Sequence, residues 1–453
     1  MNGVINLNVI AFVIGLGVMM FLLLKTKLGA LSSMLIGALI IGLGSGLGGP
    51  ETVKIITGGF GSTTSSIGIV IIFGTILGSI LEKTNAAHKI AYTILGKVGD
   101  KNACLALNIS GWIVSIPVFS DVAFVMLSPL YKAIAKKTKY PVGPLAVSMA
   151  LGLLITNSFV PPTPAPLAVA GLIGLDIGQA IMYSLIGSII PSLMGWGYAQ
   201  FYLMKKPEIW YTYSDKSVLE DVIGSDSKPV TDEDMPSFAA SIIPILIPII
   251  LIIINTTAKM LLPEDASILG ITSFVGDSNV AVAIGVVFAV LLLRDKLTSD
   301  MIVNTMSESL KECGPIIFIT AAGGSLAKVI DATGMGTAFA DVLVNSGLPI
   351  VLVPFLICGA SKFIQGSGSV ASIMTATLCA PLVVSGAIHP VTLFLAICAG
   401  SSLGSQVNNS FFWVFVNLNG YDTKTGLKTL CVGQQIIAIG GLISTLLIDA
   451  ILL

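Results

Sequence analysis

Residues 156–166 read Thr156-Asn157-Ser158-Phe159-Val160-Pro161-Pro162-Thr163-Pro164-Ala165-Pro166, and they lie inside an otherwise apolar run from 141 to 173. Four prolines fall within six of these residues. Each proline removes a backbone donor and clashes with the preceding helical turn. The run is long enough to cross a bilayer core, which needs about 20 apolar residues. It therefore predicts a membrane span that unwinds in its middle, where the freed backbone groups need protein or cavity water as partners.

The composition of the whole chain indicates a membrane protein. The chain has 453 residues, of which 54% are hydrophobic and only 10% are charged, whereas soluble domains carry about 25% charged residues. The 48 glycines suit helices that pack closely or break within a bilayer. A net charge of -1 gives no reason to expect nucleic acid as a partner. The six cysteines occur singly, so neither a metal site nor another cofactor is expected.

Apolar runs predict ten full spans and two hairpins. The full spans are expected near 4–24, 29–46, 66–82, 141–173, 179–204, 238–262, 278–293, 313–331, 388–418 and 429–453. The runs 141–173 and 388–418 are too long and too polar to be single unbroken helices. The stretches 103–130 and 349–382 are interrupted by polar residues, proline or glycine. We interpret these two as hairpins that enter the membrane and return.

The basic residues predict the orientation of the chain. With the N-terminus outside, 19 of the 23 lysines and arginines fall in inside loops, and outside loops hold only Lys54 and Lys259. This bias is what the positive-inside rule requires of a protein in the inner, or plasma, membrane. Both termini are then extracytoplasmic. The polar segment 205–237 becomes a cytoplasmic linker between two halves.

The two halves show the same order of predicted elements. Each half, 1–204 and 238–453, has three spans, a hairpin, a broken span and a last span, and Pro144–Asp176 aligns without gaps on Pro390–Asp422. Because five full spans per half is an odd number, the second half runs inverted. The predicted fold is an all-α polytopic membrane protein of two inverted repeats, each with about five transmembrane helices, a re-entrant hairpin and a broken helix. Such repeats are typical of secondary transporters, and the breaks point to the binding site.

Polar residues gather at the four interruptions. The residues predicted to bind substrate are Ser120 in the first hairpin, Thr156, Asn157, Ser158, Pro162 and Thr163 in the first broken span, Gln365, Gly366, Ser367 and Ser369 in the second hairpin, and Gln406, Asn408, Asn409 and Ser410 in the second broken span. Their side chains donate and accept hydrogen bonds, which suits a hydroxylated carboxylate. The half-helices also expose positive amide ends that attract anions.

Two ionisable residues lie beside these clusters. Asp121 is the carboxylate that we place deep in the membrane, where ionisable residues are functional by default and burial favours a proton carrier. The alternative is a structural carboxylate that hairpin-tip amides hold in place. Lys362 could pair with the substrate carboxylate, or its long stem could carry its ammonium group to the outer surface.

The clusters, in this order, resemble the gluconate permease family of sugar-acid symporters, part of the ion transporter superfamily. The residues that carry the resemblance are Phe119-Ser120-Asp121-Val122-Ala123-Phe124-Val125 with Ser128-Pro129-Leu130, Phe159-Val160-Pro161-Pro162-Thr163-Pro164-Ala165-Pro166, Ala321-Ala322-Gly323-Gly324, Gln365-Gly366-Ser367-Gly368-Ser369-Val370-Ala371 and Gly404-Ser405-Gln406-Val407-Asn408-Asn409-Ser410-Phe411-Phe412-Trp413. The resemblance implies proton-coupled uptake of gluconate or a related acid by a homodimer, through an elevator-like movement of the hairpin-bearing domain.

The sequence departs from this family pattern at three places. It has Thr163-Pro164-Ala165-Pro166 where members usually carry His-Pro-Gly-Pro, Lys362 where they tend to have arginine, and Gln406-Val407-Asn408-Asn409 where a His-Val-Asn-Asp-like run is usual. Neutral residues thus replace two histidines and a carboxylate. The choice of substrate among sugar acids and hydroxy acids, and the choice between proton and sodium, therefore stay open.

The leading hypothesis is a proton-coupled symporter of a small organic anion. The alternative is a sodium- or proton-coupled transporter of a polar amino acid such as serine. A passive channel is disfavoured, because channels use continuous pore-lining helices rather than paired hairpins with breaks. The chain has no HExxH, GxSxG or paired-histidine motif, so an enzyme is not expected.

Overall fold

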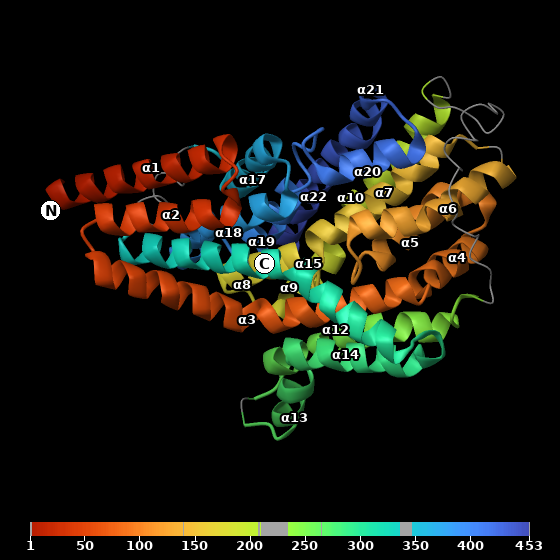
Figure 1. Ribbon diagram of the computed structural model, residues 1–453, viewed down its shortest axis with the longest axis horizontal. Helices are drawn as coiled ribbons and strands as arrows, with labels where there is room; N and C mark the ends of the chain where they lie inside the picture. Colours follow the sequence, from red (N-terminus) through yellow and green to blue (C-terminus); the bar gives the residue numbers. More distant parts are fainter. Residues whose placement is uncertain are drawn as a thin grey trace.

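The computed structural model describes residues 2–138, 140–206, 209, 234–263, 265–335 and 347–452. Every regular element in these ranges is a helix, which confirms the expected all-α class. Most of the predicted linker 205–237 lies outside the described residues. Figure 1 shows an elongated bundle whose hairpins and broken spans lie between longer helices.

Within its described residues, the first half contains ten α-helices. They are α1 (Asn2–Lys25), α2 (Gly29–Gly44), α3 (Gly49–Lys83), α4 (Ala86–Val98), α5 (Ala103–Val114), α6 (Ser120–Thr138), α7 (Val142–Phe159), α8 (Pro164–Ile173), α9 (Ile177–Gly187) and α10 (Ile189–Gly197). A π-helical turn, Tyr198–Tyr202, and a short 3₁₀ turn, Leu203–Lys205, follow α10. Helices α5 and α6 form the first hairpin, and α7 and α8 form the first broken span.

The second half has the same order of hairpin, broken span and last span. Its helices are α12 (Phe238–Leu261), α13 (Ile268–Val275), α14 (Ser278–Leu292), α15 (Ser299–Ala332), α17 (Leu352–Gln365), α18 (Gly368–Val384), α19 (Pro390–Gly400), α20 (Ser410–Asn419), α21 (Thr423–Gly426) and α22 (Val432–Leu452). A π-helical turn, Leu427–Cys431, joins α21 to α22. The second hairpin is α17–α18, and the second broken span is α19–α20.

Six helical segments of the described residues are long and apolar enough to cross a membrane, or seven if the bent pair α13–α14 counts as one span. These segments are consistent with a polytopic membrane protein. Helix α13 was not expected, because Pro263 and the charged residues around it end the preceding apolar run. It meets α14 at an angle of 62°.

The chain breaks within the stretches that the sequence marks. Helix α7 ends at Phe159 and α8 starts at Pro164, a first-turn position where a missing N–H removes no helical hydrogen bond. Helix α19 ends at Gly400 and α20 starts at Ser410. Between them Gly404 has a φ of 75°, which favours glycine. Local chemistry therefore accounts for both interruptions.

Helices α3 and α15 are longer than the expected spans 66–82 and 313–331. Their additional turns are rich in Gly, Ser, Thr and charged residues, which lowers the hydropathy of the sequence there. The two helices pack together in antiparallel directions. Ser325 Oγ donates to the carbonyl of Ile56 at 2.8 Å, and at the other end Ser309 Oγ donates to Ser79 Oγ at 3.1 Å.

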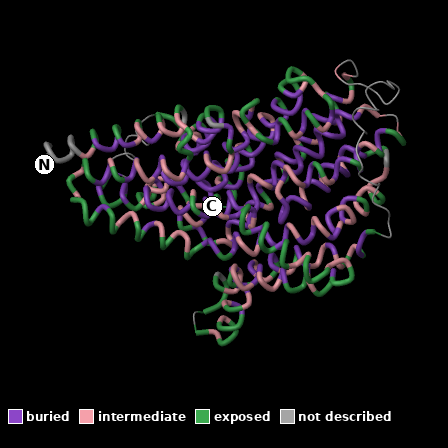
Figure 2. Tube along the Cα trace, viewed as in Figure 1, coloured by how far each residue is buried: buried purple, intermediate pink, exposed green. Residues whose placement is uncertain are grey.

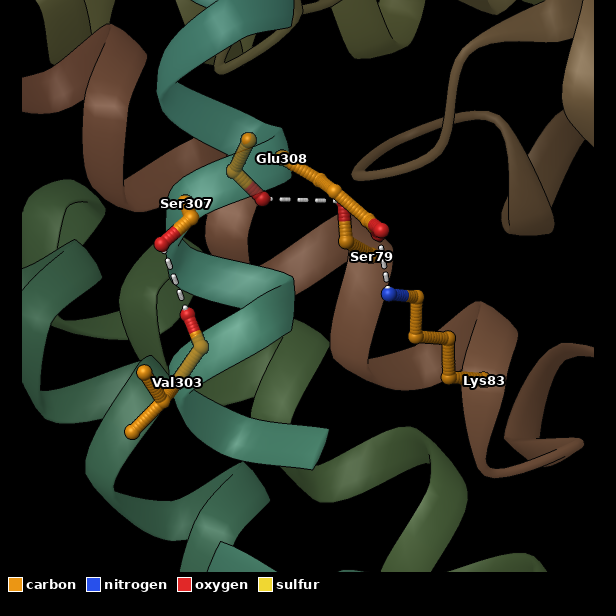
Figure 3. A network of polar contacts seen from close by, with 6 residues as sticks. Ser79, Lys83, Val303, Ser307 and Glu308 are labelled. Carbon is orange, nitrogen blue, oxygen red and sulfur yellow. Dashed lines mark hydrogen bonds and ion pairs between the residues drawn. The ribbon is translucent and has the colours of Figure 1, made fainter. Parts of the chain in front are cut away.

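The far end of this α3–α15 contact carries an ion pair. Figure 3 shows Lys83 of α3 donating to Glu308 of α15, beside the contact of Ser79 with α15. On the same turn Ser307 Oγ donates to its own helix at Val303 O, 3.1 Å away. Polar groups of these extended ends therefore find partners within the protein, which explains why the helices continue where hydropathy falls.

The hairpins and broken spans form the buried centre of the molecule. Figure 2 shows burial concentrated there, with exposed positions on the outer helices. Helix α7 packs on α5, α8 on α18, and α19 on α17 and α22. Helices α12 and α14 cover one side, where α14 packs on α3. The first broken span is largely buried in this packing, whereas Val407, Asn408 and Ser410 of the second break are exposed.

Candidate functional site

The four interruptions meet at one cavity of about 580 Å³. Its wall contains Phe119, Ser120, Asp121, Val122, Leu154, Asn157, Ser158, Ala165, Glu312, Ile316, Lys362, Gly366, Ser367, Gly368, Ser369, Ser401, Asn408, Asn409, Ser410 and Phe411. Both hairpins and both broken spans contribute, so segments from the two halves of the chain build one site. The volume is within the usual range for small-molecule pockets.

Most of the predicted site residues line this cavity. They are Ser120, Asp121, Asn157, Ser158, Lys362, Gly366, Ser367, Ser369, Asn408, Asn409 and Ser410. Their role in binding stays a prediction, but the structure brings them together.

Four predicted residues do not line this cavity. Thr156 is buried and donates to the carbonyl of Trp112 at 2.8 Å, so it joins α7 to α5. Pro162 and Thr163 line a separate cavity of about 10 Å³ beside Gly74. Gln406 lies in the loop between α19 and α20, where its carbonyl accepts from Asn409 N at 3.1 Å. A fifth predicted residue, Gln365, ends α17, and its side chain is outside what the structure describes.

Four helix N-termini converge on the cavity. Helices α6, α8, α18 and α20 begin at Ser120, Pro164, Gly368 and Ser410, and each places first-turn or capping residues in the cavity wall. The first turn of a helix has unpaired N–H groups and carries a partial positive charge. Helix α8 offers fewer donors than the other three, because Pro164 and Pro166 have no N–H. Together the four ends favour a negatively charged ligand.

Asp121 joins two of these N-termini. It lies in the first turn of α6 and is half-buried. Its Oδ2 accepts from Ser410 Oγ of α20 at 3.0 Å, and its Oδ1 accepts from Ser120 Oγ at 3.3 Å. The carboxylate therefore connects the first hairpin to the second broken span inside the cavity.

Lys362 directs its ammonium group into the protein. The residue is 4% exposed, and its Nζ donates to the carbonyl of Ser401 at the C-terminal end of α19. The alternative of a side chain that extends to the outer surface is therefore wrong. Among the described residues that line the cavity, Lys362 is the only lysine or arginine.

Asn408 and Asn409 hold the end of α17. Asn408 Nδ2 donates to the carbonyls of Phe363 at 3.0 Å and Ile364 at 3.3 Å, and Asn409 Nδ2 donates to that of Gly366 at 3.1 Å. These carbonyls lack helical partners at a helix C-terminus. Both amides thus attach the second hairpin to the second broken span, a role that the sequence did not reveal.

Sequence reasoning missed Glu312. This residue lines the cavity from α15, but it directly precedes the expected span 313–331. It also borders a cavity of about 10 Å³ together with Glu82 and Ser79, which is the size of one water molecule. The local sequence gives no signal for it, because the equally acidic Glu308, one turn earlier, is exposed and paired with Lys83 instead.

The described residues contain no group of three or more His, Cys, Asp or Glu side chains that could hold a metal ion. The cavity wall combines amides, hydroxyls, one ammonium group and the carboxylates of Asp121 and Glu312. A polar cavity between hairpins and broken spans of a multi-pass helical bundle is typical of membrane transporters.

The chain belongs to the GntP family of permeases, whose family model matches residues 7–451. This assignment confirms the resemblance to the gluconate permeases. It also confirms that the protein is a transporter and not an enzyme, and it supports a place in the inner membrane.

Individual relatives agree with this assignment. An uncharacterized permease of Haemophilus influenzae is 36% identical over 96% of this chain and 91% of that protein. A high-affinity gluconate transporter of Escherichia coli is 28% identical over 98% of this chain and 99% of its own length. Among solved structures, the YdaH transporter of Alcanivorax borkumensis has a TM-score of 0.67, with 14% identity over 89% of this chain and 90% of that one. The last similarity concerns the fold alone.

Proposed function

We propose that this protein is a secondary active transporter that carries a sugar acid, such as gluconate or a related hydroxy acid, into the cell together with a proton. The observation on which the proposal depends is the convergence of four helix N-termini and the Lys362 ammonium group on one cavity. The family and the gluconate transporter among its relatives support an organic anion as the substrate.

The substrate carboxylate would lie between Lys362 and the helix N-termini. Lys362 uses one of its three N–H donors on Ser401, so two remain for an anion. The substrate hydroxyls would contact polar side chains such as Ser158, Ser369 and Asn157, which line the same cavity. Hydroxyl and amide groups donate as well as accept, so a polyhydroxylated chain can be matched along its length.

The coupling proton would be held by the carboxylates of the cavity. Asp121 and Glu312 both line it. A substrate anion would meet repulsion from an ionised carboxylate. Protonation of a carboxylate removes that repulsion, so proton and anion would bind together. This is the thermodynamic requirement for symport.

The overall mechanism would rest on two inverted repeats, residues 1–204 and 238–453, with both termini outside and the linker 205–237 inside. The antiparallel packing of α3 on α15, which occupy the same place in each half, supports this reading. The hairpins and broken spans would move as one body in an elevator-like step within a homodimer. The same cavity would then open to each side of the membrane in turn.

Uptake into proteoliposomes would test the proposal. We expect saturable gluconate uptake that rises when the outside is made acidic, and no response to a sodium gradient. A thermal-shift series of sugar acids, hydroxy acids and serine would identify the ligand, because a ligand that binds the native state raises its melting temperature. Uptake that is linear in concentration and indifferent to both gradients would indicate a passive channel. A shift with serine alone would favour amino-acid transport.

A further inference from the structure

A second cavity lies between α10 and α22 and shares no lining residue with the polar cavity. It has a volume of about 490 Å³ and is lined by Met194, Tyr198, Tyr202, Lys428, Val432 and Ile436. Three of these side chains are apolar, two carry phenol hydroxyls and one carries an ammonium group. We call this cavity the α10–α22 groove.

The groove lies where two membrane spans end. The span Ile177–Lys205 ends three residues after Tyr202, and the span Thr423–Leu452 begins five residues before Lys428. Lys205 and Lys206 follow the first span, and Lys424 lies in the first turn of the second. Tyrosines and lysines at the end of a span are typical of the membrane–water interface. The polar end of the groove is therefore at the level of lipid headgroups.

Two π-helical turns shape the polar end. Tyr198–Tyr202 and Leu427–Cys431 are π-helical, and such turns often occur at functional sites. Tyr198 Oη donates to the carbonyls of Lys428 at 3.2 Å and Thr429 at 3.3 Å, which joins the two turns. Lys428 is thereby fixed at the groove while its side chain stays exposed.

A second ammonium group lies beside the groove. Lys206 Nζ is 5.2 Å from the centre of the Tyr202 ring, and that ring stacks on Tyr198 with a centroid distance of 5.5 Å. Asp422, the acid nearest to Lys428 along the chain, is engaged as the N-cap of α21, where Thr425 N donates to it at 2.8 Å. Lys428 and Lys206 therefore place two ammonium groups at the polar end of the groove.

We propose that the α10–α22 groove binds an anionic phospholipid. Met194, Val432 and Ile436 contact an acyl chain, and Lys428 and Lys206 bind the phosphate, with the tyrosine hydroxyls beside it. The charge selects an anionic headgroup over a zwitterionic one, because each lysine near the membrane surface strengthens binding of anionic lipid. A second copy of the chain is a poorer occupant. It would bury Lys428 in a protein contact, where lysine is depleted.

Native mass spectrometry of the purified full-length protein tests this proposal, with phosphatidylglycerol and phosphatidylethanolamine as probes. The wild type is expected to retain phosphatidylglycerol in preference to phosphatidylethanolamine. Lys428→Gln is expected to lower phosphatidylglycerol retention by about fivefold, the effect of one lysine at a membrane surface. Lys424→Gln is the matched control, since Lys424 is exposed four residues earlier and does not line the groove. It is expected to change retention little.

Three results would overturn the proposal. They are equal retention of the two lipids, equal effects of Lys424→Gln and Lys428→Gln, and crosslinking between two copies through Val432→Cys under conditions that exclude lipid. The last result would assign the groove to a second copy. All six native cysteines are buried, so such a crosslink can be attributed to the introduced cysteine. An unchanged melting temperature in lipid-free detergent would show that the Lys428→Gln protein is folded.

Discussion

Lys362 keeps its ammonium group inside the protein by donating to the carbonyl of Ser401, the C-cap of α19. The C-terminal end of a helix carries a partial negative charge, which stabilises a cation. No ion pair of Lys362 is present among the described residues. Its charge is therefore available to an incoming anion, and a carboxylate ligand would complete the desolvated pair.

Replacement of this ammonium group is expected to abolish tight substrate binding. A hydrogen bond to a charged group contributes about 1.5–3 kcal/mol. Lys362→Gln should therefore raise the Kd for the transported sugar acid by about 10- to 100-fold, measured by isothermal titration of the detergent-purified protein. Lys259→Gln is the control, because that lysine is exposed at the end of α12. Equal Kd values for Lys362→Gln and the wild type would mean that the substrate carboxylate does not bind at Lys362.

Glu312 allows coupling to be separated from binding. Under the proposed function, Glu312→Gln is permanently neutral, so the anion still binds but releases no proton. We expect acid-driven accumulation in proteoliposomes to be lost, while exchange of labelled for unlabelled substrate across the membrane persists. Glu308→Gln, one turn earlier and paired with Lys83, should retain both activities. Normal acid-driven accumulation by Glu312→Gln would leave Asp121 as the coupling carboxylate.

Among the elements, the first hairpin packs closely against α3 at a position that has no side chain. A Cβ atom at Gly78 would overlap the carbonyl oxygen of Pro117 at the tip of the hairpin. The side of α3 at Gly59 has a similar close approach, since a Cβ there would lie 2.8 Å from the carbonyl oxygen of Gly324 in α15. Glycines on α3 therefore set the distance to the first hairpin on one side and to α15 on the other.

A methyl group at Gly78 should displace the hairpin tip. Gly78→Ala is expected to lower the melting temperature in detergent and to reduce transport, because overpacking typically costs about 1–3 kcal/mol. Gly61→Ala on the same helix meets no atom within 4 Å. It should be neutral or stabilising by up to about 1 kcal/mol, as expected for glycine to alanine in a helix. Two variants that behave alike would contradict the contact at Pro117.

The same elements show what the sequence predicts and what it does not. Prolines and glycines interrupt a helix through their own backbone chemistry, so the interruptions at 156–166 and 404–410 can be predicted from the sequence. The length of α3 and α15 was not, because their polar turns are stabilised by partners more than 200 positions away, such as Ser79 with Ser309. Asn408 was recognised as a site residue, but its capping of α17 depends on tertiary packing.

On the scale of the whole molecule, the two halves meet in antiparallel fashion along α3 and α15, and each contributes two helix N-termini to the cavity. One half alone would therefore present only part of the cavity wall. The position of Glu312 also depends on tertiary packing. This residue lines the cavity because α15 packs against α3, which contacts the first hairpin. Such a residue is not identifiable from the local sequence.

The proposed inversion of the halves can be tested through the topology. An odd number of crossings per half, combined with basic loops on the inside, would place both termini outside and the linker 205–237 inside. Alkaline phosphatase fused after Leu453 should be active, since it needs the oxidising periplasm for its disulfides, and green fluorescent protein at the same position should be dark. The fluorescent protein inserted within 210–233 should be bright. A bright C-terminal fusion would mean an even number of crossings in one half. The antiparallel α3–α15 pair would then reflect packing of neighbouring spans rather than an inverted repeat.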